Sequence, residues 1–230
     1  MFQFKQFIIN DSQCAQKVGT DSVLLGAWAR VEGARRILDI GTGSGLLALM
    51  AAQRAPQAQV VGVEIDPQAV IQARENVAQS PFCQRIEIVE QDVKDFRTSE
   101  PFDCILSNPP FFQETTLPPD DSRALARHAQ FLTFRELTQA ADALLSPSGS
   151  FHVILPSDLV RDFVTQSLIV GLNLTRRCLV RTVQRKPPRR TLLSFSRLTP
   201  ASVAEEELVL QLPDGTRTAA YNLLAKDFYL

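Results

Sequence analysis

The sequence predicts an α/β fold in which helices cover both faces of a mostly parallel sheet. Three observations support this prediction. Short, almost continuous apolar runs alternate with helical stretches from residue 36 to residue 170, a glycine-rich loop follows the first apolar run, and two strand-like runs come after residue 170. Continuous apolar strands are typical of parallel sheets that are buried on both faces. We expect seven strands in all.

Each element follows from its own pattern of apolar residues. Short apolar runs predict buried strands, and apolar residues at helical spacing predict amphipathic helices. Asp66-Pro67 indicates a helix start, because Asp caps a helix and Pro suits its first position. Along the chain we predict strand 36–40, helix 44–55, strand 60–65, a helix from 67 to about 79, strands 85–90 and 102–107, helix 133–145, strand 150–155 and helix 157–170.

The last two predicted strands, 173–183 and 191–198, are joined by the loop 184–190. A loop this short cannot form a parallel crossover, so the pair must be an antiparallel hairpin. Parallel βα units that end in such a hairpin are the Rossmann-like layout of class I methyltransferases. At this length we expect one domain over residues 1–230. It would consist of a capping segment (1–35) with one helical stretch (22–29), a cofactor-binding core (36–170), and a hairpin and tail (171–230).

Composition excludes several other classes of protein. A hydrophobic share of 45% and a net charge of −1 are typical of a soluble globular chain. The longest apolar run, residues 46–52, is far shorter than a membrane span, and the N-terminus has no signal peptide pattern. The four cysteines form no C-x-x-C pair, so we expect neither a metal site nor disulfides. We expect a cytoplasmic protein that is a monomer.

The glycine-rich loop runs from Asp39 to Gly45 and joins a strand to a helix. Glycines at Gly41, Gly43 and Gly45 allow a sharp turn and a close approach to a ligand. A dinucleotide fingerprint requires Gly or Ala where Leu46 stands, and a phosphate-binding loop requires Lys there. The loop therefore fits neither ligand, and a purely structural turn is the alternative interpretation.

Two acidic residues follow the next strands of the predicted sheet. Glu64 ends the second strand and is placed to accept the hydroxyls of a ribose, and Asp92 follows the third and is placed to contact an adenine amino group. A solvated loop acid is the alternative for Asp92. Together with the glycines, these acids suit a nucleoside that carries no phosphate. S-adenosylmethionine is such a ligand, and we predict that it is the cofactor. The predicted cofactor-binding residues are Lys17, Thr20, Asp39, Gly41, Gly43, Gly45, Glu64, Ile65, Asp92, Val93 and Asn108.

Residues 17–21 precede the predicted helix 22–29 and have two interpretations. In one, Thr20 or Asp21 caps the helix. In the other, the segment folds over the cofactor as a lid. The sequence favours neither.

The fourth strand ends in Asn108-Pro109-Pro110-Phe111, which we predict to be the catalytic motif. An adenine amino group is a poor nucleophile, because its lone pair is delocalised into the ring. Hydrogen bonds accepted by the Asn108 side chain and the Pro109 carbonyl would hold both N–H bonds and direct the lone pair toward a methyl donor. Phe111 could stack on the base. An ordinary Asn-Pro turn is the alternative.

Several motifs together resemble one family of methyltransferases. Residues 108–111 match the [NDS]-PP-[YFW] motif of amino methyltransferases. The chain also carries Phe4-Lys5-Gln6-Phe7, Lys17-Val18-Gly19-Thr20-Asp21, Leu24-Leu25-Gly26-Ala27-Trp28 and Asp227-Phe228-Tyr229-Leu230. Over nearly its whole length it resembles the bacterial tRNA(Val) adenine-N6 methyltransferases. The resemblance implies methylation of adenine 37, beside the anticodon. Phe111 stands where the family often has Tyr, which keeps stacking but loses a hydroxyl.

A basic strip without any acid lies between residues 176 and 190. It comprises Arg176, Arg177, Arg181, Arg185, Lys186, Arg189 and Arg190. Its loop should lie at the same edge of the sheet as Asn108, where it would suit RNA phosphates. A solvated hairpin is the alternative. We predict RNA contacts at Arg185, Lys186, Arg189 and Arg190, and at Arg123 and Arg127 in the polar loop 112–128.

Three rival functions share parts of this pattern. Methyltransferases of the guanine 2-amino group in ribosomal RNA can share the Asn-Pro-Pro motif. Protein glutamine methyltransferases share it too, but they carry an extra N-terminal helical domain, whereas only about 35 residues precede the first strand here. An RNA-binding protein that has lost activity is disfavoured by the intact loop, Glu64 and catalytic motif.

Overall fold

The computed structural model describes residues 1–14, 17–110 and 132–229. Its central element is an eight-stranded sheet. Its strand order is β10-β8-β9-β7-β6-β3-β4-β5. The strands are β3 (Arg36–Ile40), β4 (Gln59–Glu64), β5 (Ile86–Glu90), β6 (Phe102–Ser107), β7 (Leu145–Pro156), β8 (Asn173–Val183), β9 (Arg190–Ser196) and β10 (Ala204–Gln211).

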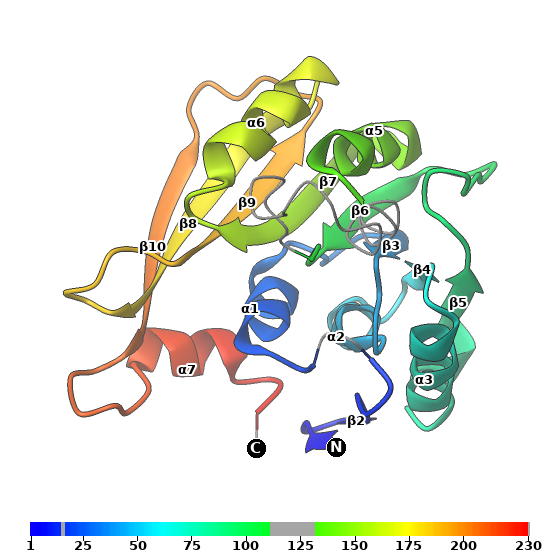
Figure 1. The fold of residues 1–230 in the computed structure, drawn as a ribbon, viewed down its shortest axis with the longest axis horizontal. Helices are drawn as coiled ribbons and strands as arrows, with labels where there is room; N and C mark the ends of the chain where they lie inside the picture. Colours follow the sequence, from blue (N-terminus) through cyan, green and yellow to red (C-terminus); the bar gives the residue numbers. More distant parts are fainter. Residues whose placement is uncertain (15–16, 111–131, 230) are drawn as a thin grey trace, which may run out of the picture.

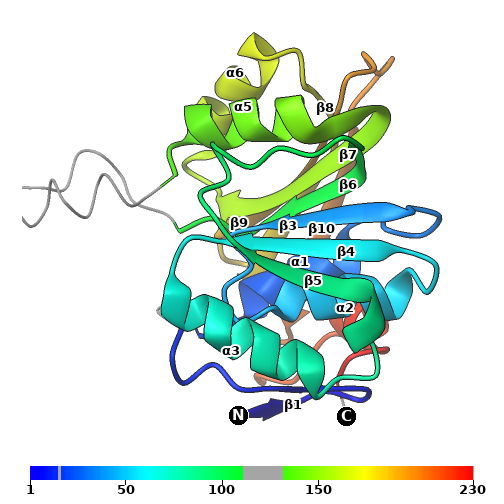
Figure 2. The same ribbon diagram turned by 90° about the vertical axis from the view of Figure 1, so that its right-hand side faces the viewer.

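Helices cover both faces of this sheet (Figures 1 and 2). One face carries α1 (Thr20–Trp28), α2 (Leu46–Arg54), α3 (Pro67–Ala78) and α7 (Ala219–Ala225), and the other carries α5 (Phe134–Leu144) and α6 (Val160–Ile169). A short 3-10 helix, η1 (Cys83–Arg85), precedes β5. The two hydrophobic cores correspond to the two faces. The predicted α/β class, with helices on both faces of a mostly parallel sheet, is thus confirmed.

Local sequence signals set the helix starts. Asp66 caps α3 by accepting a hydrogen bond from the Gln68 N–H, with Pro67 at the first helical position. Thr133 and Glu136 form a capping box at α5. Helix α1 differs from expectation: its N-cap is Gly19, and no side chain caps it. Capping by Thr20 or Asp21 was therefore wrong, since Thr20 is already the first helical residue.

Strand direction places the functional loops at one edge. Strands β5, β4, β3, β6 and β7 run parallel to one another, and β9 is antiparallel to both β7 and β8. The carboxyl ends of the parallel strands therefore bring the loop after β3, Glu64 and Asn108 to one edge. Pairing of Arg190 with Pro156 puts the predicted hairpin loop at the carboxyl end of β7, the same edge.

The sheet has one more strand than predicted. Strand β10 pairs parallel to β8 at the sheet's outer edge, and α7 follows it. Three consecutive glutamates follow the first residue of this strand, Ala204, so it lacks the apolar run of a buried strand. In the structure it pairs with β8, where Glu205, Glu206 and Glu207 meet arginines.

The chain ends lie together beneath α1 and α2 (Figure 2). The N-terminal residues form a small antiparallel pair, β1 (Phe2–Gln3) with β2 (Ile8–Ile9), which the sequence did not predict. The Lys5 N–H donates to the Phe228 carbonyl at 2.9 Å, and Phe4 stacks between Phe7 and Tyr229. Within the described ranges, no helix is long and apolar enough to cross a membrane.

Candidate active site

A pocket opens at the carboxyl edge of the sheet, between the start of α1, the loop after β3 and the end of β6. Four of the predicted site residues line it: Lys17, Gly41, Gly43 and Asn108. The other lining residues were not predicted: Val18, Ser22, Thr42, Ser44, Leu46 and Leu47. Ser22, Thr42 and Ser44 carried no signal of their own, because short hydroxyl residues are common beside helix starts.

The glycine loop is shaped for a close ligand. Gly41 and Gly43 have φ angles of 70° and 54°, in the left-handed region that favours glycine, and a Cβ added to either would meet nothing within 4 Å. This open space faces the pocket. Gly45, with a φ of 83°, is the N-cap of α2 and lies against Ala73; it does not line the pocket, and its contact with the cofactor stays a prediction.

Glu64 holds this loop from the neighbouring strand. One carboxylate oxygen accepts a hydrogen bond from the Gly43 N–H at 2.9 Å. The other accepts from the N–H groups of Ile65 and Asp66, at 2.9 and 3.1 Å. The oxygen that accepts from Gly43 has a second lone pair, whereas the other oxygen already accepts two hydrogen bonds, so the carboxylate retains capacity for a ribose hydroxyl.

Asp39 is fully buried below the loop. Its Oδ2 accepts from the Thr42 hydroxyl at 2.5 Å and from the Ala48 N–H at 3.2 Å, which fixes the loop to the start of α2. Its Oδ1 has no partner among the described residues. Burial raises the pKa of Asp39 to about 7, although the two hydrogen bonds oppose this shift.

Asn108 ends β6 and is 7% exposed. The preceding Ser107 hydroxyl donates to the Ile40 carbonyl at 3.0 Å, which fixes the end of β6 to β3. The Asn108 Nδ2 donates to Ser22 Oγ at 2.9 Å. Its Oδ1 is buried, and no residue in 1–14, 17–110 or 132–229 donates to it. Pro109 is buried beside it and Pro110 is exposed, whereas Phe111 lies outside the described residues.

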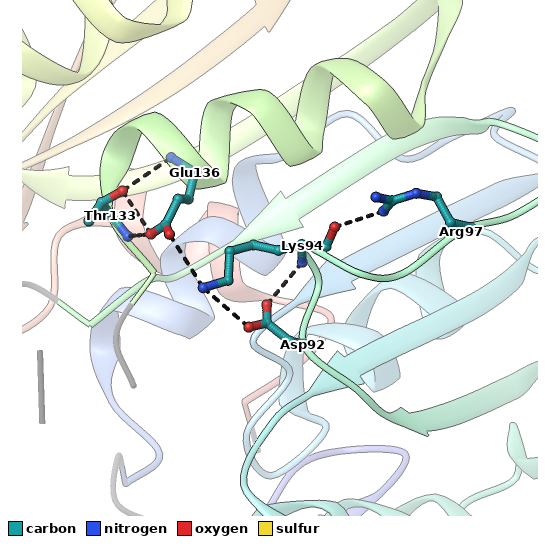
Figure 3. A network of polar contacts seen from close by, with 5 residues as sticks. All are labelled: Asp92, Lys94, Arg97, Thr133 and Glu136. Atoms are coloured by element: carbon teal, nitrogen blue, oxygen red, sulfur yellow. Dashed lines mark hydrogen bonds and ion pairs between the residues drawn. The ribbon is translucent and has the colours of Figure 1, made fainter. Parts of the chain in front are cut away.

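Asp92 and Val93 lie farther along the edge, after β5, and do not line the pocket. Figure 3 shows the contacts of Asp92. Its Oδ1 accepts the Lys94 N–H at 2.9 Å, and its Oδ2 is 3.3 Å from Lys94 Nζ, which also contacts Glu136. These contacts fix the carboxylate in a turn, and a contact with adenine remains a prediction.

The segment before α1 partly supports the lid interpretation. Lys17 Nζ donates to the carbonyls of Asp11 and Ser12, and Val18 N–H donates to the Asp11 side chain at 2.8 Å. Lys17 and Val18 thus form one wall of the pocket. Thr20 is exposed and does not line it.

The predicted basic strip divides into two parts. Arg176, Arg177 and Arg181 form ion pairs with the three glutamates of β10 at 2.5–2.6 Å, so these three cations have acidic partners that lie outside the strip. The acids that neutralise it come from a strand that was not predicted. Of the predicted RNA contacts, the exposed ones are Arg185, Lys186 and Arg189.

Arg190 pairs with Asp21 at 2.7 Å, which joins β9 to the first turn of α1. The predicted contacts Arg123 and Arg127 lie outside the described residues. No cluster of three or more His, Cys, Asp or Glu suited to a metal ion occurs in the part of the chain that the structure describes.

Comparison with known protein families and sequences identifies the family of this chain. The methyltransferase small domain model matches residues 13–162. A protein of Bacteroides thetaiotaomicron, named tRNA1(Val) (adenine(37)-N6)-methyltransferase, is 44% identical over 230 residues, covering 100% of this chain and 97% of that protein. The chain belongs to this family. The sequence-based resemblance is thereby confirmed.

Solved structures confirm the class I methyltransferase fold. A predicted O-methyltransferase from Agrobacterium tumefaciens superposes with a TM-score of 0.70 at 20% identity, covering 90% of this chain and 96% of its own. A TehB-like S-adenosylmethionine-dependent methyltransferase from Corynebacterium glutamicum gives 0.53 at 19% identity, covering 80% and 90%. At these identities they establish the fold alone.

S-adenosylmethionine is the cofactor of this family and fold. The residues present fit it. Open space beside Gly41 and Gly43 admits a ligand close to the backbone, and no phosphate-binding lysine follows the loop, as a nucleoside without phosphates requires.

Proposed function

We propose that this chain transfers a methyl group from S-adenosylmethionine to N6 of adenine 37 in tRNA1(Val). One observation carries the chemical part of the proposal. The Oδ1 of Asn108 is a buried acceptor without a partner in the described structure, at the pocket end of a parallel strand. A buried acceptor of this kind is costly unless a ligand supplies the donor, and an exocyclic amino group is such a donor.

The chemistry needs positioning more than acid–base strength. When bound, S-adenosylmethionine supplies an activated methyl group on a positively charged sulfur. Asn108 Oδ1 and the Pro109 carbonyl accept the two N–H bonds of the adenine amino group and orient its lone pair. Pro109 has a fixed φ, and the following Pro110 restricts its ψ, so the direction of the Pro109 carbonyl is constrained. The proton is lost to solvent after transfer, since the methylated nitrogen is strongly acidic.

The residues proposed to hold the cofactor come from three consecutive loops. Gly41 and Gly43 leave space for its close approach, Glu64 accepts a hydrogen bond from a ribose hydroxyl, and Asp92 accepts one from its adenine amino group. Support comes from the remaining lone pair of Glu64 and the placement of Asp92 after the next strand. Lys17 and Val18 close the opposite wall.

The proposed tRNA path crosses the hairpin loop. Arg185, Lys186 and Arg189 are exposed at the carboxyl edge of the sheet, the edge that holds Asn108. Cations in this position suit phosphates on either side of a base that enters the pocket. A loop nucleotide such as adenine 37 leaves its stack at lower cost than a base in a duplex.

One assay separates this function from its rivals. The protein is incubated with methyl-labelled S-adenosylmethionine and, separately, with bulk tRNA, bulk ribosomal RNA and release-factor protein. Label in tRNA alone supports the proposal. Label in ribosomal RNA would indicate a guanine 2-amino substrate, and label in the release factor would indicate a glutamine amide.

A further inference from the structure

Asn108 can do its proposed work in only one orientation of its side-chain amide. With Oδ1 toward the substrate, it accepts an amino N–H. Rotated by half a turn, it would present its own N–H groups to a donor, which is repulsive. The two orientations have almost the same shape, so packing alone discriminates poorly between them. The substrate amino group itself favours the orientation with Oδ1 toward it, and a hydrogen-bond partner that satisfies Nδ2 in this orientation holds the amide in place.

Ser22 supplies this partner. Its Oγ accepts from Asn108 Nδ2 at 2.9 Å, and it lines the same pocket from the first turn of α1. The adjacent Asp21 forms an ion pair with Arg190 of β9, so this turn is itself attached to the sheet. When a substrate amino group occupies Oδ1, the Ser22 contact leaves neither end of the amide unsatisfied.

We propose that Ser22 is the positioning residue that holds Asn108 with its oxygen toward the substrate amino group. This inference rests on the proposed function, because it takes the substrate to be an N–H donor. The hydroxyl acts through Asn108 and touches no reacting atom. Removing it leaves a buried N–H unsatisfied and lets the amide rotate to find other partners.

The first test compares Ser22→Ala with Ser22→Thr in single-turnover methylation of tRNA. We expect Ser22→Ala to slow methylation roughly tenfold, the value of about one buried hydrogen bond. Cofactor and tRNA dissociation constants should stay within about twofold, and Ser22→Thr should restore most of the rate. Ser167→Ala, which removes a buried hydroxyl on the far face of the sheet, is the matched control. A parent-like rate for Ser22→Ala would refute the positioning role.

The second test asks whether Ser22 acts through the Asn108 amide. In the Asn108→Ala background the amide is absent, so Ser22→Ala should have little further effect on the remaining methylation. An equal slowing in both backgrounds would contradict the proposed role.

The third readout does not depend on methylation. In the parent, the side-chain N–H signals of Asn108 should exchange slowly in NMR spectra, and Ser22→Ala should shift them and speed their exchange. Unchanged signals would overturn the contact. Shifted signals in a protein that methylates no tRNA would instead support the contact and refute the proposed function.

Discussion

Among single residues, Glu64 has the clearest double role. Its carboxylate fixes Gly43, Ile65 and Asp66 and is proposed to bind ribose. We expect Glu64→Ala to weaken S-adenosylmethionine binding by ~1.5–3 kcal/mol, the value of a hydrogen bond to a charged group. Isothermal titration calorimetry measures this directly. Glu87→Ala, an exposed glutamate on the adjacent β5, should leave the affinity unchanged. Equal affinities for Glu64→Ala and the parent would remove Glu64 from the site.

The raised pKa of Asp39 predicts that the free energy of unfolding depends on pH. Its pKa is raised to about 7 in the folded protein, above the ordinary value of 3.8. The unfolded chain therefore releases this proton first, and the contribution of Asp39 to stability falls as pH rises from about 4 to about 7.

Asp39→Asn removes this dependence, since the amide does not titrate. We expect the free energy of unfolding of the parent, relative to Asp39→Asn, to fall by about 3 kcal/mol between pH 4.5 and pH 7. Urea unfolding at a series of pH values measures it. Parallel pH profiles for the two proteins would show that Asp39 does not carry the effect.

Among single residues, the sequence predicted which residues meet in the pocket better than it predicted their hydrogen-bond partners. Gly41, Gly43 and Asn108 meet in one pocket because strand ends in a parallel sheet share an edge, which periodicity reveals. Ser22 could not be predicted. It lies far from Asn108 in the chain, and only the packing of α1 brings the two side chains together.

Among the elements, the hairpin and β10 determine which arginines of the basic strip have acidic partners. The five parallel strands and the hairpin follow from local patterns, and β3, β6 and β8 have the predicted boundaries. Strand β10 does not, because its three glutamates break the apolar pattern of a strand, and their pairing with arginines of β8 is a contact between distant segments. The sequence therefore overstated the free positive charge of the strip.

This division of charge can be measured. Replacing Arg185, Lys186 and Arg189 together with alanine should weaken tRNA binding and flatten its dependence on salt by about 0.7–0.9 in slope for each phosphate that is no longer neutralised. Filter binding at several salt concentrations gives both quantities. The charge-neutral double variant Arg177→Ala with Glu205→Ala removes an existing ion pair, so its slope should match the parent. Parent-like affinity and slope in the triple variant would place the tRNA path elsewhere.

In the whole molecule, the two chain ends form part of one core on the α1–α2 face. Phe228 is 1% exposed and its carbonyl accepts from Lys5, although the two residues are at opposite ends of the chain. Sequence patterns could not place these ends, because a contact between distant segments leaves no periodicity.

Phe228→Ala should therefore lower the free energy of unfolding by about 3–5 kcal/mol, as expected for a buried phenylalanine. Leu223→Ala, on the exposed side of α7, should change it by less than about 0.5 kcal/mol. Urea denaturation followed by circular dichroism compares them. Similar small decreases for both would show that the C-terminal residues are not part of the core.

We propose above that the buried Oδ1 of Asn108 accepts a hydrogen bond from the adenine amino group that is methylated. The most direct measurement is mass spectrometry of nucleosides and fragments from tRNA1(Val) after incubation with S-adenosylmethionine and either the parent or Asn108→Ala. We expect N6-methyladenosine at position 37 with the parent, and at least ~100-fold slower formation with Asn108→Ala, with little change in cofactor affinity. Parent-like methylation by Asn108→Ala, or a methyl group on any other atom, would contradict this proposal.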